Sequence, residues 1–146
     1  MGQSREAGRV VMLGRLVSVT GAATAIAGVA AWMTVRVQLA AERIVVPSSA
    51  PWFAGQEVRG PHTAFAQAEA IRRTAVEATG GRTYGEMAAD DPMAAMAMNA
   101  SLLRSSLFTS VLAFGTAGAQ VGIGAVLVAV GAGLARAGRL LQEANS

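Results

Sequence analysis

The chain has 146 residues, of which 53% are hydrophobic and only 14% charged, and its mean hydropathy is +0.43. Soluble domains average about 25% charged residues, so this composition indicates a membrane protein. The net charge is only +3 and no basic stripe alternates with aromatic residues, which excludes nucleic acid as an expected partner. The chain has no cysteine, and its one histidine, His62, cannot supply a two-histidine metal site.

The first predicted element is a membrane span over residues 16–35, an uncharged segment between Arg15 and Arg36. About twenty residues cross the hydrocarbon core of a bilayer. A signal peptide is the alternative, because arginines precede the segment and "VAA" near its end resembles a cleavage site. The apolar stretch is longer than the usual range of about 7 to 15 residues. We therefore predict an uncleaved anchor that follows a tail over residues 1–15.

A small, mostly helical module is predicted over residues 36–104. An amphipathic helix covers about 63–79 and ends at a pair of glycines. A second helix begins at about residue 92, where Asp91 and Pro92 form a typical start, and continues into the next span. Glu86, Asp90 and Asp91 have two interpretations, as ligands of a hard cation or as caps that favour a helix N-terminus.

The second predicted span covers residues 105–135, and a tail follows over residues 136–146. Arginine outnumbers acidic residues in both tails, whereas the module between the spans has equal numbers of each. The positive-inside rule therefore predicts a plasma-membrane protein with both termini in the cytoplasm and residues 36–104 outside it. Trp32 and Trp52 are candidate anchors at the outer membrane interface. The expected fold is an all-α membrane protein, a two-helix hairpin with an extracytoplasmic module.

Small residues recur every three or four positions in both spans, which is the pattern that lets membrane helices approach closely. We predict that the two stripes pack on each other, antiparallel. In the first span the stripe contains Gly14, Ser18, Gly21, Ala25 and Gly28. In the second it contains Gly115, Gly118, Gly122, Ala125, Ala129 and Ala132.

A different face of the second span carries polar or small groups at mid-membrane. Gln120 lies sixteen residues from each bounding arginine, with Thr116 and Gly124 one turn away on either side. An amide that faces lipid is costly. We therefore predict that Thr116, Gln120 and Gly124 face another helix, from a second membrane subunit or from another copy of this chain.

A methionine cluster, Met93, Met96 and Met98, is a candidate site for a soft metal ion on the outer side. Thioethers suit Cu(I), but methionines also fill irregular apolar gaps, and packing is the interpretation that we favour. No cofactor is expected.

The stretches "ERIVV", "GPHTAFAQA", "ATGGRTYGEM" and "NASLLRSSLFTSVLAFG" carry a resemblance that covers roughly residues 10–134. The chain resembles a family of small actinobacterial membrane proteins with two spans. Members of that family are often described as aromatic ring-opening dioxygenases. Ring opening by non-haem iron typically needs two histidines and a carboxylate, and this chain has only His62.

No acid, base and nucleophile converge in the sequence, so we expect a protein without enzymatic activity. The primary expectation is an accessory or scaffold subunit of a bacterial cell-envelope membrane complex, in contact with the lipid bilayer. The alternative is a membrane protein that handles copper or a lipid outside the cell.

Overall fold

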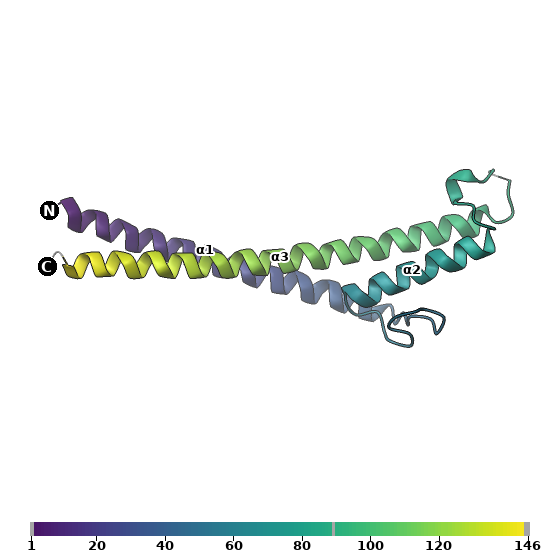
Figure 1. Ribbon diagram of the computed structural model, residues 1–146, viewed down its shortest axis with the longest axis horizontal. Helices are drawn as coiled ribbons and strands as arrows, with labels where there is room; N and C mark the ends of the chain where they lie inside the picture. Colours follow the sequence, from purple (N-terminus) through teal and green to yellow (C-terminus); the bar gives the residue numbers. More distant parts are fainter. Residues whose placement is uncertain (1, 89, 145–146) are drawn as a thin grey trace. The chain divides into compact units, whose positions relative to one another are not determined.

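The computed structural model describes residues 2–88 and 90–144, and the chain folds into helices joined by loops (Figure 1). The helices are α1 (Gly2–Ala41), α2 (Pro61–Ala78), the short 3-10 helix η1 (Tyr84–Glu86) and α3 (Ala94–Ala144). Within the described residues no strand forms, and Val45 and Glu57 make an isolated antiparallel bridge. The prediction of an all-helical fold is confirmed.

The two longest helices, α1 and α3, are long and apolar enough to cross a membrane. The predicted spans 16–35 and 105–135 lie inside them, and the predicted helix at about 63–79 corresponds to α2. Asp91 accepts a hydrogen bond from the backbone N–H of Met93 at 2.9 Å, and α3 then continues without interruption to Ala144. Both predicted tails are therefore helical where the structure describes them; residues 1, 145 and 146 lie outside the described part.

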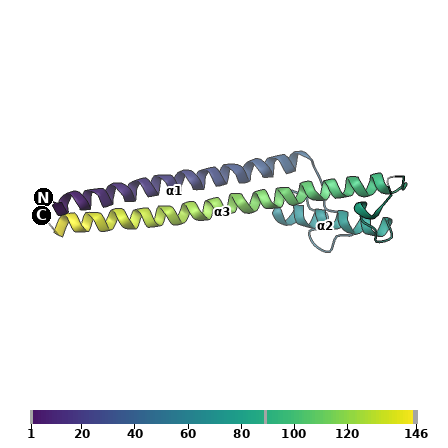
Figure 2. The same ribbon diagram turned by 90° about the horizontal axis from the view of Figure 1, so that it is seen from above.

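The chain divides into two compact units, each described here by itself. In the first unit, residues 2–31 of α1 and 116–144 of α3 lie side by side and antiparallel, with the start of α1 beside the end of α3 (Figures 1 and 2). The contact face of α1 contains glycine at every seventh position, at residues 14, 21 and 28. Ala117, Gly124 and Gly131 form the matching series on α3.

The backbones of the two helices touch at these glycines. A methyl group placed on Gly14 would lie 2.6 Å from the carbonyl oxygen of Gly131, and one on Gly21 would lie 2.7 Å from that of Gly124. At Gly28 the carbonyl oxygen of Ala117 is also 2.7 Å away. Each step of seven residues along α1 is thus matched by an equal step back along α3. No side chain larger than hydrogen fits at these positions of α1.

All five predicted positions of the α1 stripe lie in or beside this contact. Ser18 donates a hydrogen bond of 3.4 Å to the carbonyl oxygen of Val128, and Ala25 packs against Gly124. A regular stripe of small residues on α1 therefore marks the face that meets α3.

The predicted stripe on α3 is wrong as the contact with α1. A methyl group on Gly115 or Gly122 would meet nothing within 4 Å, and all six predicted positions are exposed: Gly115, Gly118, Gly122, Ala125, Ala129 and Ala132. The real contact face is turned by roughly 120° around the helix. Helix α3 carries small residues on two faces. Only the face with Gly124, Gly131 and Gly138 brings its backbone into contact with α1.

Of the three predicted partner-facing residues, the structure contradicts Gly124. It is buried in the contact with α1, so it cannot face a helix outside the hairpin. Gln120 borders that contact, since its Cβ lies 3.0 Å from the methyl position of Gly28, yet the residue is exposed. Thr116 is exposed one turn before it.

The second unit, residues 32–115, is built around α2 and a core of small and medium side chains. Ala64, Ala66, Ala68 and Ala70 are all buried, so α2 is covered on more than one side. Phe114 is fully buried, and its ring meets that of Trp32 edge to face with centroids 4.7 Å apart. The predicted interface anchor Trp32 is thus half-buried in this core.

Replacing Gly21 or Gly124 by alanine should destabilise the hairpin by about 1–3 kcal/mol, because the added methyl group overlaps backbone atoms of the facing helix. Gly122→Ala is the matched control. It adds the same methyl group to an open face and should be neutral or stabilising by up to about 1 kcal/mol, through helix propensity. Denaturation in mild detergent, followed by circular dichroism, measures the difference. Equal effects of Gly124→Ala and Gly122→Ala would contradict the contact described here.

Candidate functional site

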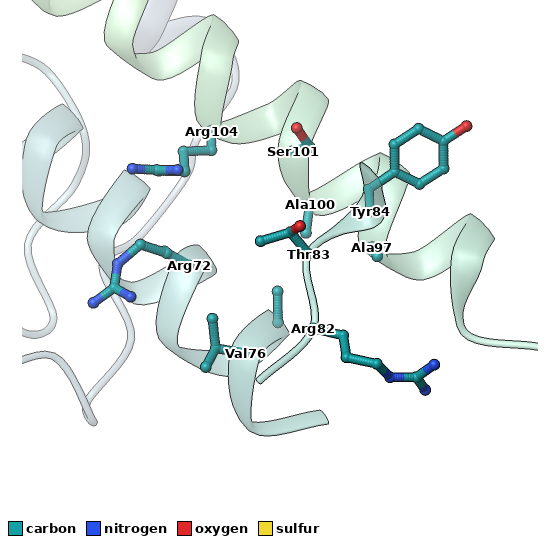
Figure 3. Close-up of a pocket in the computed structure, with 10 residues that line it drawn as sticks. Arg72, Val76, Arg82, Thr83, Tyr84, Ala97, Ala100, Ser101 and Arg104 are labelled. Atoms are coloured by element: carbon teal, nitrogen blue, oxygen red, sulfur yellow. The ribbon is translucent and has the colours of Figure 1, made fainter. Parts of the chain in front are cut away.

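A cavity of about 110 Å³ lies between α2, the loop that follows it and the start of α3 (Figure 3). Its wall is mostly alanine, valine and the stems of arginines, with hydroxyl groups at its edge. The lining residues are Arg72, Ala75, Val76, Arg82, Thr83, Tyr84, Ala97, Ala100, Ser101 and Arg104. Three arginines from three segments of the chain therefore surround one small apolar cavity.

The head groups of these arginines are held outside the cavity. In Figure 3, Arg72 and Arg104 extend to one side of it and Arg82 to the other. Arg72 donates two hydrogen bonds to Glu69, at 2.6 and 3.0 Å, and Arg82 donates one to Asp91 at 2.8 Å. Arg104 lies over the ring of Phe108, with its guanidinium carbon 5.2 Å from the ring centroid. The arrangement is an apolar cavity with a basic rim.

The loop between α2 and α3 is shaped by hydrogen bonds to its acidic side chains. Glu86 accepts from the backbone N–H and the hydroxyl of Thr83, at 2.7 and 2.8 Å, and these bonds lower the pKa of Glu86. The backbone N–H of Met93, together with the side chain of Arg82, lowers the pKa of Asp91. Glu86 and Asp91 therefore act as caps, and Asp90 is exposed. In the part of the chain that the structure describes, no three histidine or acidic side chains are close enough to share a metal ion.

The three methionines of the candidate copper site do not surround one point. Met96 lines a cavity of about 340 Å³ with residues of α2, whereas Met98 lines a separate cavity of about 450 Å³ together with Met87. Met93 is half-buried at the start of α3. This division favours packing as the role of the cluster.

The sequence analysis missed the basic rim. Arg72, Arg82 and Arg104 are separated by ten and twenty-two positions, and they share a cavity only because α2 and α3 pack together. An ion-pair pattern was visible on α2, where Glu69 precedes Arg72 and Arg73 by three and four positions. No comparable signal in the sequence connects Arg82 or Arg104 to it.

Comparison with models of known protein families, with curated proteins and with solved structures finds no match.

Acid should weaken this unit through Glu69. Its hydrogen bonds to Arg72, and more weakly to Arg73, lower the pKa of Glu69 from 4.5 to about 2. A lowered pKa in the folded state contributes stability above the unfolded value, and this contribution disappears as the pH falls from about 4.5 towards 2. Thermal unfolding in detergent between pH 6 and pH 2 should therefore depend less on pH for Glu69→Gln. Identical pH profiles for the wild type and Glu69→Gln would contradict the role of Glu69.

Proposed function

We propose that this chain is a non-enzymatic integral membrane protein, an accessory or scaffold subunit of a bacterial cell-envelope membrane complex. The surface of its first unit supports a lipid environment, since large apolar side chains face outwards there. Val19, Ile26 and Val126 are 68%, 70% and 62% exposed. In water this much apolar surface would promote aggregation, whereas lipid tails are as apolar as these side chains.

The observation that carries the proposal is the uncovered stripe on α3. Gly115 and Gly122 have open space where a side chain would be, and Ala125, Ala129 and Ala132 continue the stripe along the same side. Helices in lipid associate mainly by close packing, for which small side chains are needed. Because the hairpin uses another face of α3, this stripe is available to a helix from a second subunit or from another copy of the chain.

Gln120 adds a polar contact on the other flank of the hairpin. Its side chain is exposed and forms no hydrogen bond with a described residue. At mid-membrane a bare amide is costly, so a polar group of a neighbouring helix would stabilise it. Interhelical hydrogen bonds of this kind contribute about 0.6 kcal/mol on average. A bond of this size is too weak to hold a subunit by itself, so close packing must supply most of the docking energy.

The proposed orientation places both tails in the cytoplasm and residues 36–104 outside, in the plasma membrane. It follows from the excess of arginine in the two tails. The resemblance to two-span actinobacterial membrane proteins agrees with this arrangement and remains a prediction.

Labelling of single cysteines tests the orientation. Glu6→Cys, Ser49→Cys and Glu143→Cys place one thiol in each segment, and all three positions are exposed. An impermeant maleimide applied to intact cells should label only Ser49→Cys, because it cannot reach the cytoplasmic tails. Labelling of Glu6→Cys or Glu143→Cys, with Ser49→Cys protected, would reverse the proposed orientation.

Substitution on the uncovered stripe tests the docking function. Gly122→Leu should leave the hairpin intact and lower recovery of the co-purified partner at least about fivefold per folded molecule, a loss of about 1 kcal/mol. Val130→Leu, at an exposed position off the stripe, is the control and should retain the partner. Gentle detergent extraction with quantitative mass spectrometry measures both the identity and the recovery of the partner. Equal recovery for the two variants would exclude the stripe as the docking face.

A further inference from the structure

The loop between α1 and α2 is a folded element with its own small interior. Val46 and Val58 are each only 1% exposed. The N–H of Val58 donates to the carbonyl of Ile44 at 2.8 Å, and Val46 exchanges hydrogen bonds with Gln56 and Gly55, each 2.9 Å long. These contacts fix the course of the backbone, and with it the direction in which the tip of the loop points.

The tip presents two aromatic side chains to the outside. Trp52 is 58% exposed and Phe53 is 42% exposed, although both are large and apolar. Phe53 has a φ of 59°, in the left-handed region, where a bulky residue is strained. Burial of the ring does not offset that strain. Strain that is kept without burial is typical of residues whose position serves recognition.

Basic side chains gather beside Phe53. An open pocket of about 290 Å³ has Arg36, Phe53, Glu57, Arg59, His62 and Thr63 in its wall. The rings of Phe53 and His62 are stacked with centroids 6.3 Å apart. Arg59 pairs with Glu57, whereas Arg36 forms no ion pair with a described residue. Two arginines against one carboxylate leave the pocket with an excess of positive charge.

The backbone N–H groups just before α2 are already occupied within the chain. Those of Arg59 and Gly60 both donate to the hydroxyl of Thr63, at 3.2 Å. The guanidinium of Arg36 keeps its fork of N–H donors. Such a fork matches the oxygens of a phosphate group and can bind two of them at once.

The position of Arg36 in the chain indicates where that phosphate comes from. It is the first charged residue after the uncharged segment 16–35 of α1. If α1 spans a bilayer, as the proposed function requires, Arg36 lies at the level of the lipid headgroups. Exposed tryptophan and other aromatic rings favour the same layer. The pocket therefore combines a phosphate-binding cation with the aromatic residues of a membrane interface.

We propose that the pocket of Arg36, Phe53, Arg59 and His62 binds a phosphate group, supplied by the headgroup of an anionic phospholipid. The exposed rings of Trp52 and Phe53 lie in the interfacial layer beside that headgroup. Bound lipid fixes the loop against the membrane surface and orients the second unit on it.

Binding of short-chain lipids to the full chain in mild detergent tests this proposal. The protein is titrated with dihexanoylphosphatidylglycerol, with dihexanoylglycerol, which lacks the phosphate, and with inorganic phosphate. Native mass spectrometry and tryptophan fluorescence follow the binding. Phosphatidylglycerol should bind saturably and dihexanoylglycerol should not. Displacement by inorganic phosphate only at far higher concentration identifies the lipid as the source, whereas equal affinity supports phosphate binding with a free anion as the source.

Three variants assign the binding to the pocket. Arg36→Gln should weaken phosphatidylglycerol binding about tenfold, through loss of a charge-assisted pair of hydrogen bonds. Glu57→Gln should strengthen it, because a competing carboxylate is removed, and a misfolded protein would not show this gain. Arg73→Gln removes the same charge as Arg36→Gln from an exposed site on α2 outside the pocket, and should bind like the wild type.

Equal affinity of Arg36→Gln and Arg73→Gln for phosphatidylglycerol would overturn the proposal. So would equal binding of dihexanoylglycerol and phosphatidylglycerol. Membrane insertion is tested separately by extraction of cell membranes with alkaline carbonate. Release of the chain by carbonate would refute the proposed function, even where the purified protein binds phosphate.

Discussion

The close approach of the α1 and α3 backbones is the constraint on which the hairpin depends. At Gly14, Gly21 and Gly28 there is room for hydrogen alone, so the two helices meet through main-chain atoms. In lipid no hydrophobic effect drives helices together, and van der Waals contact between closely packed surfaces must replace it. Large apolar side chains such as Val19, Ile26 and Val126 are turned outwards, an arrangement that suits lipid better than water.

The second unit is held together by buried apolar side chains and hydrogen bonds instead. Its interior contains Val46, Val58 and Phe114 among alanines, and ion pairs lie on its surface. The small side chains of α2 let several segments pack around one helix, at the cost of apolar burial per residue. Hydrogen bonds in the connecting loops compensate, as at Thr79, whose buried hydroxyl donates to the carbonyl of Arg82 at 2.6 Å.

The helices could be predicted from the sequence because local signals define them. Uncharged stretches bounded by arginines indicate α1 and α3, and Gly80 with Gly81, both at positive φ, ends α2. The α1 stripe was predictable for a similar reason, since this helix carries a single regular series of small residues. On α3 two such series exist, and periodicity cannot distinguish them. Only the fit of Gly124 and Gly131 against the backbone of α1 selects the contact face.

The basic rim and the pocket beside Phe53 were beyond prediction from the sequence. Arg36 and Arg59 lie twenty-three residues apart, and they share a pocket only because the intervening loop folds back through the hydrogen bonds of Val46 and Val58. For the methionine cluster, closeness in the sequence did not produce a shared site. Met96 and Met98 are two residues apart, yet a helix turns them towards different cavities.

Because glycine repeats every seven residues, the two helices of the hairpin could pack in several nearly equivalent registers. Sliding α3 along α1 by one repeat, about 10 Å, sets Gly131 opposite Gly21 and again places glycine against glycine. Backbone contact therefore determines which faces of α1 and α3 meet, but it does not distinguish between registers that differ by seven residues. Residues that break the repeat remove the degeneracy: Ser18, through its bond to Val128, in the first unit, and the ring pair of Trp32 and Phe114 in the second. The repeated glycines thus provide the close packing of the hairpin, and the few residues outside the repeat determine its register.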